Sequence, residues 1–441
     1  MSRKHLVAII GRPNVGKSSF FNYVTGKRIS IVEDTPGVTR DRIYSPVEWS
    51  GRTFTMVDTG GLEPEATDNI LKQMRRQAEI ASELADVILF MVDAKDGVVA
   101  SDKDIATFIR KTRKPVILVV NKVDDFFNLP DDIYEFYNLG LGDYYCISSA
   151  HGLGIGEVLD AILENLPADD GEDDNDNIIK VAVCGKPNAG KSSLINKILG
   201  EDRVIVSDVA GTTRDAIDTY FTRGEQEFCF IDTAGMRKRG KITDNIERYS
   251  IMRSLGAIDR CDVVLIMVDG KDGVTEQDTK IAGYAHNQGK ACILVVNKWD
   301  IVDKDSNTMD KYRIEVKEGF NFMLYAPVMF ISALTGRGVS KLVDEIVRVN
   351  ANASARVGTG VLNDILNEAT AMVQPPSDKG KRLKIFYMTQ VSVKPPVFTV
   401  FVNDADLFHF SYQRYIENQI RKCIDFEGTP IILKIKERDK E

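Results

Sequence analysis

Long apolar runs, which a membrane protein needs, are missing from this sequence. The longest ones, such as Val87–Val92 and Val263–Val268, fall far short of the roughly 20 residues that span a bilayer. At the N-terminus, Met1–His5 lead directly into Leu6–Ile10, which is too short for the core of a secretion signal. We therefore expect a cytoplasmic protein with no integral membrane partner.

Cysteine and histidine are also scarce. The 6 cysteines include no C-x-x-C pair, and the 4 histidines lie far apart, without metal-ligand spacing. This pattern argues against a disulfide framework and against a zinc site. We expect the cysteines to be buried, reduced thiols.

The sequence has 57 basic and 65 acidic residues, a net charge of −8. Because nucleic-acid binding needs basic residues to neutralise phosphate, this balance argues weakly against a general nucleic-acid binder. The acidity is uneven. The net charge is −5 over residues 1–168, −6 over 169–177, +1 over 178–350 and +2 over 351–441. The argument against an RNA partner therefore does not apply to the second half of the chain.

An internal repeat organises the 441 residues. Gly11–Ser19 (GRPNVGKSS) recurs 174 residues later as Gly185–Ser193 (GKPNAGKSS). Four more matches follow in the same order: T-R-D at 39–41 and 213–215, D-T-x-G at 58–61 and 232–235, N-K-x-D at 121–124 and 297–300, and a serine at 148 and 332. Small insertions in the second copy account for the drift in offset.

The pattern of apolar runs predicts an α/β fold. In each repeat, short strand-like runs alternate with longer amphipathic stretches, which is typical of a mostly parallel sheet with helices on both faces. Residues 169–177 contain no apolar residue and are predicted to be a linker. We expect domains at 1–168 and 178–350, followed at 351–441 by a small α+β module in the order α, β, β, α, β.

Each repeat carries the phosphate-binding pattern G-x-x-x-x-G-K-S between a strand-like run and a helical stretch. Glycines let backbone N–H groups turn toward a β-phosphate, and the helix N-terminus adds its positive end. Lys17 and Lys191 are predicted to reach the β- and γ-phosphates, and Ser18 and Ser192 to offer a hydroxyl to Mg²⁺. The predicted phosphate loops are Gly11, Arg12, Pro13, Asn14, Val15, Gly16, Lys17, Ser18 and Ser19, and Gly185, Lys186, Pro187, Asn188, Ala189, Gly190, Lys191, Ser192 and Ser193.

An aspartate follows 47 residues after the first glycine of each loop, at the end of a strand-like run. Asp58 and Asp232 are predicted to lie near the same Mg²⁺, and Gly61 and Gly235 to bring an N–H close to the γ-phosphate. An isolated D-x-x-G is as often a simple turn, but the matched spacing favours the nucleotide site. The predicted segments are Asp58, Thr59, Gly60, Gly61 and Leu62, and Asp232, Thr233, Ala234, Gly235 and Met236.

The N-K-x-D pattern indicates which base is bound. A carboxylate accepts hydrogen bonds from the N1–H and the exocyclic amine of guanine, whereas adenine offers an acceptor and nothing at these positions. Both copies follow strand-like runs, at the edge where open α/β sheets bind ligands, so we predict GTP or GDP rather than ATP. The predicted base-side residues are Asn121, Lys122, Val123, Asp124, Ser148, Ser149 and Ala150, and Asn297, Lys298, Trp299, Asp300, Ser332, Ala333 and Leu334.

Taken together, these motifs and their duplication closely resemble the bacterial double-Era-like GTPases of the TrmE-Era-EngA-like family, over essentially the whole chain. The resemblance implies two tandem P-loop GTPase domains and a C-terminal KH-like domain. It also implies GTP hydrolysis and a role in assembly of the large (50S) ribosomal subunit. We expect rRNA and ribosomal proteins as partners, no DNA, and a monomer in solution.

Thr39 and Thr213 lie 28 residues after the first glycine of each loop. By analogy with switch I, they should bind Mg²⁺ and the γ-phosphate in the GTP state, although a solvated threonine in a turn is the alternative. Leu62 and Met236 stand where Ras-like proteins carry the glutamine that orients water, so slow turnover is expected. The catalytic candidates are Lys17, Thr39, Gly61, Lys191, Thr213 and Gly235.

Related GTPases with this hydrophobic replacement include several that use K⁺, held partly by an asparagine of the phosphate loop. Asn14 and Asn188 occupy that position, so the resemblance implies K⁺ stimulation; the alternative is that these asparagines only stabilise the loop.

Two features leave the mode of action open. The basic run Arg237–Lys241 is either a solvated face or a contact with RNA or another domain. No G-x-x-G occurs between Val361 and Glu441, so the tail lacks the loop with which KH domains bind RNA. It either binds RNA in another way, through basic residues such as those at 379–382 and 421–422, or relays the nucleotide state of the G domains by packing. The alternative to a ribosome-associated enzyme is a GTP-dependent scaffold or signalling switch that binds proteins and does not contact rRNA.

Overall fold

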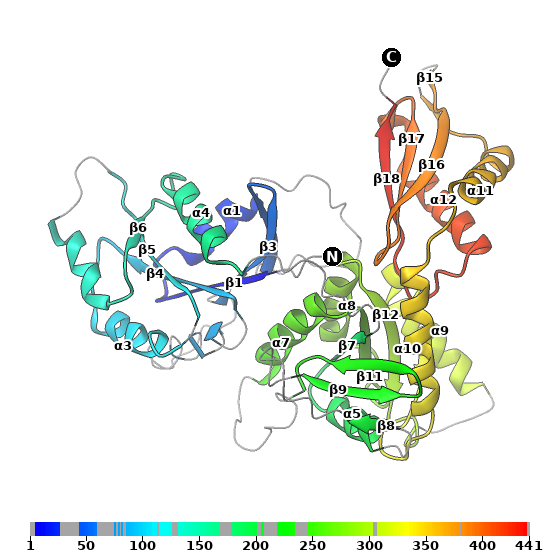
Figure 1. The fold of residues 1–441 in the computed structure, drawn as a ribbon, viewed down its shortest axis with the longest axis horizontal. Coiled ribbons are helices and arrows are strands. Elements are labelled where there is room, and N and C mark those ends of the chain that lie inside the picture. Colours follow the sequence, from blue (N-terminus) through cyan, green and yellow to red (C-terminus); the bar gives the residue numbers. More distant parts are fainter. Residues whose placement is uncertain are drawn as a thin grey trace. The chain divides into compact units, whose positions relative to one another are not determined.

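The computed structural model describes residues 5–26, 44–59, 75, 78–79, 81–82, 85–112, 114–125, 131–167, 178–200, 204–206, 218–233, 246–302, 307–378 and 381–438. The described residues before Asp174 form one compact unit, and those from 178 onward form a second. Figure 1 shows the elements of both units.

The first unit is built on a six-stranded sheet in the order β2-β3-β1-β4-β5-β6, in which only β2 runs antiparallel to its neighbour. Its strands are β1 (His5–Gly11), β2 (Tyr44–Trp49), β3 (Arg52–Asp58), β4 (Val87–Asp93), β5 (Val116–Asn121) and β6 (Tyr144–Cys146). Strands β1 and β4 are buried along their whole length, as expected for central parallel strands covered on both faces.

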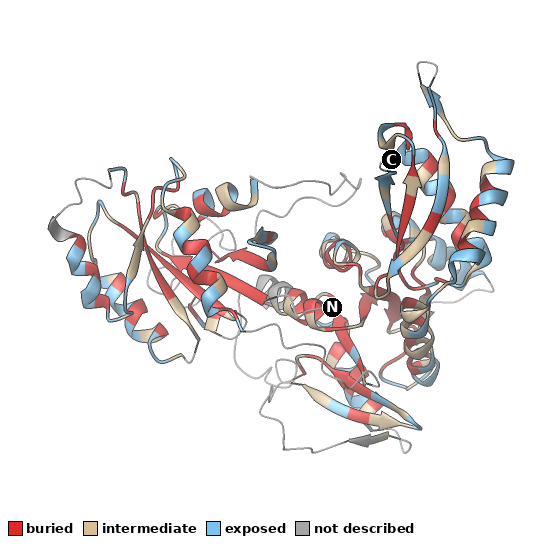
Figure 2. Ribbon diagram, turned by 45° about the horizontal axis from the view of Figure 1, so that its top comes forward, coloured by how far each residue is buried: buried red, intermediate tan, exposed pale blue. Residues whose placement is uncertain are grey.

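Helices cover both faces of this sheet. They are α1 (Lys17–Gly26), α3 (Ala100–Ile109), the 3₁₀ helix η2 (Asp131–Leu139) and α4 (Ile155–Asn165). One core contains Phe20 of α1 and Val158 of α4, and the other contains Ile105 of α3 and Phe136 of η2. Successive residues of β1 point into opposite cores, Val7 and Ile9 into the first and Ala8 and Ile10 into the second, so this central strand is buried throughout, like the other strands drawn in red in Figure 2. The predicted α/β layers are confirmed.

The second unit repeats this architecture with a seven-stranded sheet in the order β13-β12-β11-β7-β10-β9-β8. Its strands are β7 (Ile178–Cys184), β8 (Val204–Val206), β9 (Thr219–Arg223), β10 (Gln226–Phe230), β11 (Val263–Asp269), β12 (Ala291–Asn297) and β13 (Val328–Phe330). Its helices are α5 (Lys191–Leu199), α7 (Ile246–Arg260), α8 (Glu276–Asn287), α9 (Thr308–Gly319), η3 (Asn321–Met323) and α10 (Val339–Ser354). In α10, buried residues such as Leu342, Val343 and Ile346 recur at helical spacing, so one face packs on the sheet.

The tail forms the predicted module, with helices on one side of a three-stranded sheet (Figure 1). Its elements are α11 (Thr359–Met372), β16 (Ile385–Ser392), β17 (Val397–Val402), the 3₁₀ helix η4 (Ala405–Leu407), α12 (Phe410–Cys423) and β18 (Ile432–Glu437). A hairpin of β14 (Ser377–Asp378) and β15 (Lys381–Arg382) precedes β16, and the apolar pattern does not predict it because the hairpin buries almost nothing. Strand β17 pairs antiparallel with β16 and parallel with β18.

Hydrogen bonds and ion pairs join the tail module to the domain built on the seven-stranded sheet, which belongs to the same unit. The Cys292 N–H donates to the Gly428 carbonyl (2.7 Å), and the Gly428 N–H donates to the Tyr325 carbonyl (2.8 Å). Gly428 has φ +84°, and a Cβ there would lie 2.4 Å from Val349 Cγ2, so only glycine fits this close approach. Arg348 of α10 adds ion pairs to the tail loop, at 2.9 Å to Asp425 and 2.7 Å to Glu427.

Arg421 belongs to this junction rather than to a free basic surface. Its guanidinium donates to the carbonyls of Phe426 (2.9 Å) and Thr429 (3.1 Å), pairs with Glu417, and lies 5.1 Å from the centre of the Tyr325 ring. The prediction that Arg421 offers a basic spot to RNA is therefore wrong, because its hydrogen bonds are directed into the protein.

The junction contains a histidine with a displaced pKa. His286 Nδ1 lies 2.9 Å from the Tyr325 hydroxyl, and burial, with the nearby charge of Arg421, lowers the His286 pKa to about 4. Between pH 6.5 and 4, the unfolded chain binds a proton that the folded chain excludes, so stability falls as pH falls. We expect a loss of up to about 3 kcal/mol in the free energy of unfolding at pH 4.

The variant His286→Asn, which keeps a polar atom near the Nδ1 position, should lose clearly less stability over this pH range. Urea unfolding of both full-length proteins at pH 7 and pH 4.5, followed by circular dichroism, measures the difference. Equal losses in the two proteins would show that His286 does not carry the effect.

Membrane-spanning length is not reached by any helix in the described part of the chain. All 6 cysteines are free, and Cys184, Cys229, Cys261 and Cys292 are buried, whereas Cys146 is half-buried and Cys423 is exposed. Burial raises the pKa of Cys184 and Cys229 to about 12, so these thiols stay protonated. The expectation of buried thiols is thus wrong for Cys423, because it lies on the solvent side of the last turn of α12.

Candidate nucleotide-binding sites

The phosphate loops lie where a buried strand turns into a helix, between β1 and α1 and between β7 and α5. Gly16 and Gly190 have φ +97° and +96°, a conformation that other residues rarely adopt. A Cβ on Gly16 would lie 2.1 Å from Asn121 Nδ2, and one on Gly190 would lie 2.1 Å from Asn297 Nδ2. Each loop therefore packs directly against the asparagine of its own N-K-x-D motif.

The motif lysines are buried inside their loops, each with 6% of its surface exposed. The Lys17 ammonium donates to the carbonyls of Gly11 (2.7 Å) and Arg12 (2.6 Å). Lys191 does the same with Gly185 (2.5 Å) and Lys186 (2.8 Å). A buried ammonium beside the N-terminus of a helix is a fitting partner for phosphate oxygens.

A hydroxyl and a carboxylate meet in the first site. Ser18, in the first turn of α1, donates its hydroxyl to Asp58 Oδ2 at the end of β3, over 2.6 Å. Asp58 is 1% exposed. Hard oxygen ligands of this kind suit a divalent ion such as Mg²⁺, which keeps its remaining positions for water and phosphate.

The second site surrounds its carboxylate differently. Asp232 Oδ1 lies 3.2 Å from the Arg253 guanidinium of α7, and its N–H donates to Asp218 Oδ1 (2.8 Å). Asp218 is in turn paired with Arg260.

The asparagine of each N-K-x-D motif ties three segments together. The Asn121 amide donates to the carbonyl of Val15 (2.7 Å) and accepts from the N–H of Ser149 (3.0 Å). The second repeat forms both bonds through Asn297, with 2.8 Å to its loop and 2.9 Å to Ala333. These segments, distant in the sequence, therefore lie side by side in each repeat.

The aspartate of the motif faces solvent, where a base can reach it. The Asp124 side chain is 44% exposed, accepts from the Ser148 hydroxyl (2.9 Å), and pairs with Lys95 (2.8 Å). The hydrogen bond from Lys95 lowers the Asp124 pKa, which keeps the carboxylate ionised as the acceptor that guanine requires. Asp300 is likewise exposed.

Two aspartates that the sequence analysis does not single out bind the lysines of the N-K-x-D motifs. Asp93 and Asp269 end β4 and β11, and their carboxylates lie 2.5 Å from the ammonium groups of Lys122 and Lys298. Both lysines have positive φ, +69° and +61°. The signal was present, because Asp93 and Asp269 recur at the same offset of 176 as the two N-K-x-D motifs.

The other predicted residues vary in environment. Thr59 donates to the Ile9 carbonyl (2.5 Å), and Thr233 lies 2.6 Å from the Thr219 hydroxyl. Trp299 is 4% exposed, whereas Leu334 is 81% exposed. Outside the described residues lie Thr39, Gly60, Gly61, Leu62, Thr213, Ala234, Gly235 and Met236, and also 169–177 and 237–241. The roles assigned to these residues stay predictions.

Comparison with known proteins agrees with this geometry. The family model described as "50S ribosome-binding GTPase" matches residues 6–122 and again 180–298. The model described as "KH-domain-like of EngA bacterial GTPase enzymes, C-terminal" matches residues 356–436.

Whole-chain relatives decide the family. The protein named GTPase Der of Acetivibrio thermocellus is 64% identical over 99% of this chain and 100% of its own length, and that of Ruminiclostridium cellulolyticum is 62% identical over 99% of each. The chain belongs to the GTPase Der family. Among solved structures, Aquifex aeolicus Era bound to GDP·AlF₄⁻ is 21% identical, covering 59% of this chain and 93% of that one, with a TM-score of 0.30.

Membership in the Der family defines the activity. The protein is a GTPase with two G domains, which binds GTP and GDP together with a divalent metal ion, and it ends in a KH-like domain. The two sheets with their phosphate loops are these G domains.

Proposed function

We propose that GTP binding and hydrolysis at the two sites control association with the large ribosomal subunit during its assembly. The observation that supports this proposal most is that the KH-like domain has an aromatic and basic sheet face and is joined to the second G domain by hydrogen bonds and ion pairs. We also propose domain boundaries at 1–168, 169–177, 178–350 and 351–441, and nucleotide binding by the phosphate-loop, D-T-x-G and N-K-x-D residues of each G domain.

The sheet face opposite α11 and α12 has the chemistry of a surface for RNA. Tyr387 stacks on Phe401 with ring centres 4.3 Å apart, and Phe401 is paired in register with Lys436. Lys434 lies two residues earlier on the same face, and both lysines are exposed. Aromatic rings stack on bases and lysines attract phosphate, so this face supports RNA contact without a G-x-x-G loop.

Bonds between the domains support control by nucleotide. Besides the contacts of Gly428 and Arg348, the Lys394 N–H donates to the Ala353 carbonyl (2.9 Å), and its ammonium lies 3.3 Å from Asp262. Asp262 directly precedes β11, a central strand of the second G domain. A change of that domain with its nucleotide would therefore be transmitted to the KH-like domain.

We expect this GTPase to sediment with purified 50S particles in one nucleotide state, GDP or a non-hydrolysable GTP analogue, more than in the other. Binding should weaken with salt, and the slope of log K against log salt concentration measures this dependence. In the double variant Lys434→Gln with Lys436→Gln, the magnitude of that slope should fall by about 1 for each lysine removed. The matched control is Lys422→Gln on α12, on the helical side. Nucleotide-independent free protein, or binding that survives RNase treatment, would favour a scaffold for proteins.

We also propose Mg²⁺ as the divalent ion, slow hydrolysis because Leu62 and Met236 cannot orient water, a monomer in solution, and stimulation by K⁺. Asn14 and Asn188 both have φ +65°, where asparagine is favoured for the backbone alone. That backbone preference is the alternative to a K⁺ ligand, and glycine variants separate the two. With K⁺ bound by these asparagines, KCl raises the hydrolysis rate above that in NaCl, and Asn14→Gly with Asn188→Gly, which keep the backbone, remove the difference. Equal rates in both salts would contradict the proposal.

A further inference from the structure

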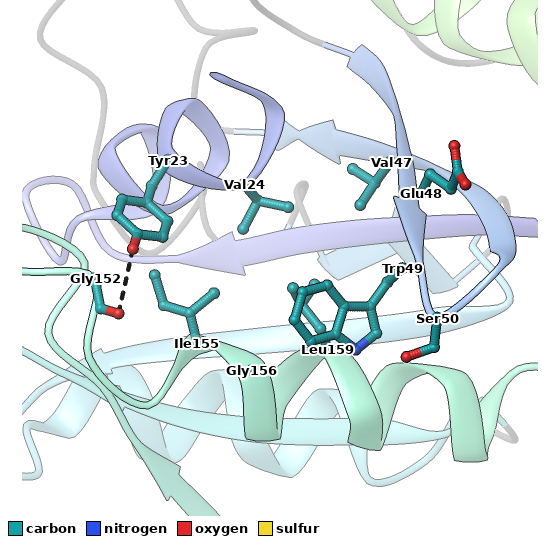
Figure 3. Close-up of a pocket in the computed structure, with 10 residues that line it drawn as sticks. All are labelled: Tyr23, Val24, Val47, Glu48, Trp49, Ser50, Gly152, Ile155, Gly156 and Leu159. Carbon is teal, nitrogen blue, oxygen red and sulfur yellow. Dashed lines mark hydrogen bonds between the residues drawn. The ribbon is translucent and has the colours of Figure 1, made fainter. Parts of the chain in front are cut away.

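A pocket of about 570 Å³ opens in the first G domain between α1, β2 and α4 (Figure 3). None of its lining residues belongs to the predicted nucleotide site. Val47, Ile155 and Leu159 form a buried apolar base, and Trp49 and Tyr23 stand at the sides, partly exposed. Volume and lining are those of a site for a small ligand or a few side chains.

The indole at one end of the pocket is fixed by a carboxylate. Trp49 Nε1 donates to Asp160 Oδ1 of α4 over 2.7 Å. Asp160 is exposed, so its carboxylate stays accessible beside the ring. At the other end, the Tyr23 hydroxyl lies 3.4 Å from the Gly152 carbonyl, which Figure 3 shows across the pocket from Trp49.

Among the described residues beside the pocket, the exposed carboxylates are not paired with a basic residue of β2 or α4. Glu48 on β2 and Glu157, Asp160 and Glu164 on α4 are exposed, and α4 contains no basic residue. The basic residue of the β2–β3 hairpin, Arg52, donates to the carbonyls of Leu163 and Pro167 and is engaged there. Such a rim repels phosphate and attracts a cation.

In the second repeat, the aspartate that corresponds to Asp160 binds an arginine of the same chain. Arg223 occupies the position of Trp49, and Asp344 that of Asp160. The Arg223 guanidinium donates to Asp344 (2.8 Å) and to the Ser340 hydroxyl (2.6 Å). In the first repeat an uncharged indole replaces this arginine, and no cation pairs with Asp160 among the described residues.

We propose that this pocket binds an arginine side chain, with an apolar neighbour, from a protein partner. The guanidinium stacks on the Trp49 ring and donates to Asp160, as Arg223 does to Asp344. The apolar neighbour of the arginine packs against Val47 and Leu159. The inference is independent of the RNA contact proposed for the KH-like domain.

The test uses the full chain and the peptide acetyl-Ala-Leu-Arg-Leu-Ala-amide, with a second peptide in which neutral citrulline replaces arginine. The chain has 2 tryptophans, and Trp299 is buried away from the peptide, so a change in tryptophan fluorescence on peptide binding reports on Trp49. We expect saturable binding of the arginine peptide. Its affinity should fall about tenfold or more with citrulline and in Asp160→Asn. The matched control, Asp344→Asn, should bind as the wild type does.

A second variant keeps the test open if Asp160→Asn misfolds. A Cβ on Gly156 would lie 3.7 Å from Trp49 Cζ2, so Gly156→Leu fills the pocket and leaves Asp160 in place; it should abolish peptide binding. The proposal is overturned if the wild type shows no saturable binding, if citrulline binds equally well, or if a uridine oligonucleotide displaces the peptide.

Discussion

Replacing Gly16 by alanine should remove nucleotide binding from the first G domain and leave the second intact, and Gly190→Ala should do the reverse. The new Cβ would lie 2.1 Å from the side-chain amide of Asn121 or Asn297. The loop and its asparagine must then separate, which breaks the bond from Asn121 to Val15 or its counterpart. Positive φ adds backbone strain.

Strain and the lost hydrogen bond together cost about 2–4 kcal/mol, which weakens GDP binding about 30- to 10³-fold at that site. Calorimetric titration with GDP should show one site in each single variant and none in the double variant. Gly51→Ala is the matched control, because Gly51 also has positive φ (+79°) but no atom within 4 Å of its Cβ. Two intact sites in Gly16→Ala would mean that the loop does not need this glycine.

Exchanging Asp124 for asparagine should change base preference at the first site from guanine to xanthine. A carboxylate accepts from the N1–H and the amine of guanine, whereas an asparagine amide presents a donor to that amine. Xanthine carries a carbonyl at the same position, which accepts from the new amide. Asp300→Asn should act in the same way at the second site.

The loss of a charge-assisted pair predicts GDP binding about 10²-fold weaker at the altered site, with xanthosine diphosphate bound in its place. Asp125→Asn, the adjacent carboxylate, is the control and should change neither nucleotide. If Asp124→Asn retains full GDP affinity, then Asp124 does not read the base.

Sequence alone predicts the layers, because buried parallel strands such as β4 and β11 are continuous apolar runs. It also predicts that Asn121 and Asp124 lie near the phosphate loop, because the carboxyl ends of parallel strands share one edge of a sheet. The repeat strengthens both predictions, since two copies of one pattern with the same spacing are not accidental.

Individual side-chain pairings are what the sequence does not predict. The pairs Lys122–Asp93 and Arg253–Asp232 join residues whose distance depends on how strands and helices pack. Arg421 reads as a free basic residue until the fold places carbonyl groups around it. The pocket beside Trp49 depends likewise on the close approach of β2 and α4.

With two G domains, one chain should bind two guanine nucleotides. Titrating the wild-type protein with GDP and with ADP, both in Mg²⁺, by calorimetry tests it most directly. Two GDP molecules should bind per chain, and ADP should give no heat of binding. One GDP per chain, or ADP bound as tightly as GDP, would contradict it.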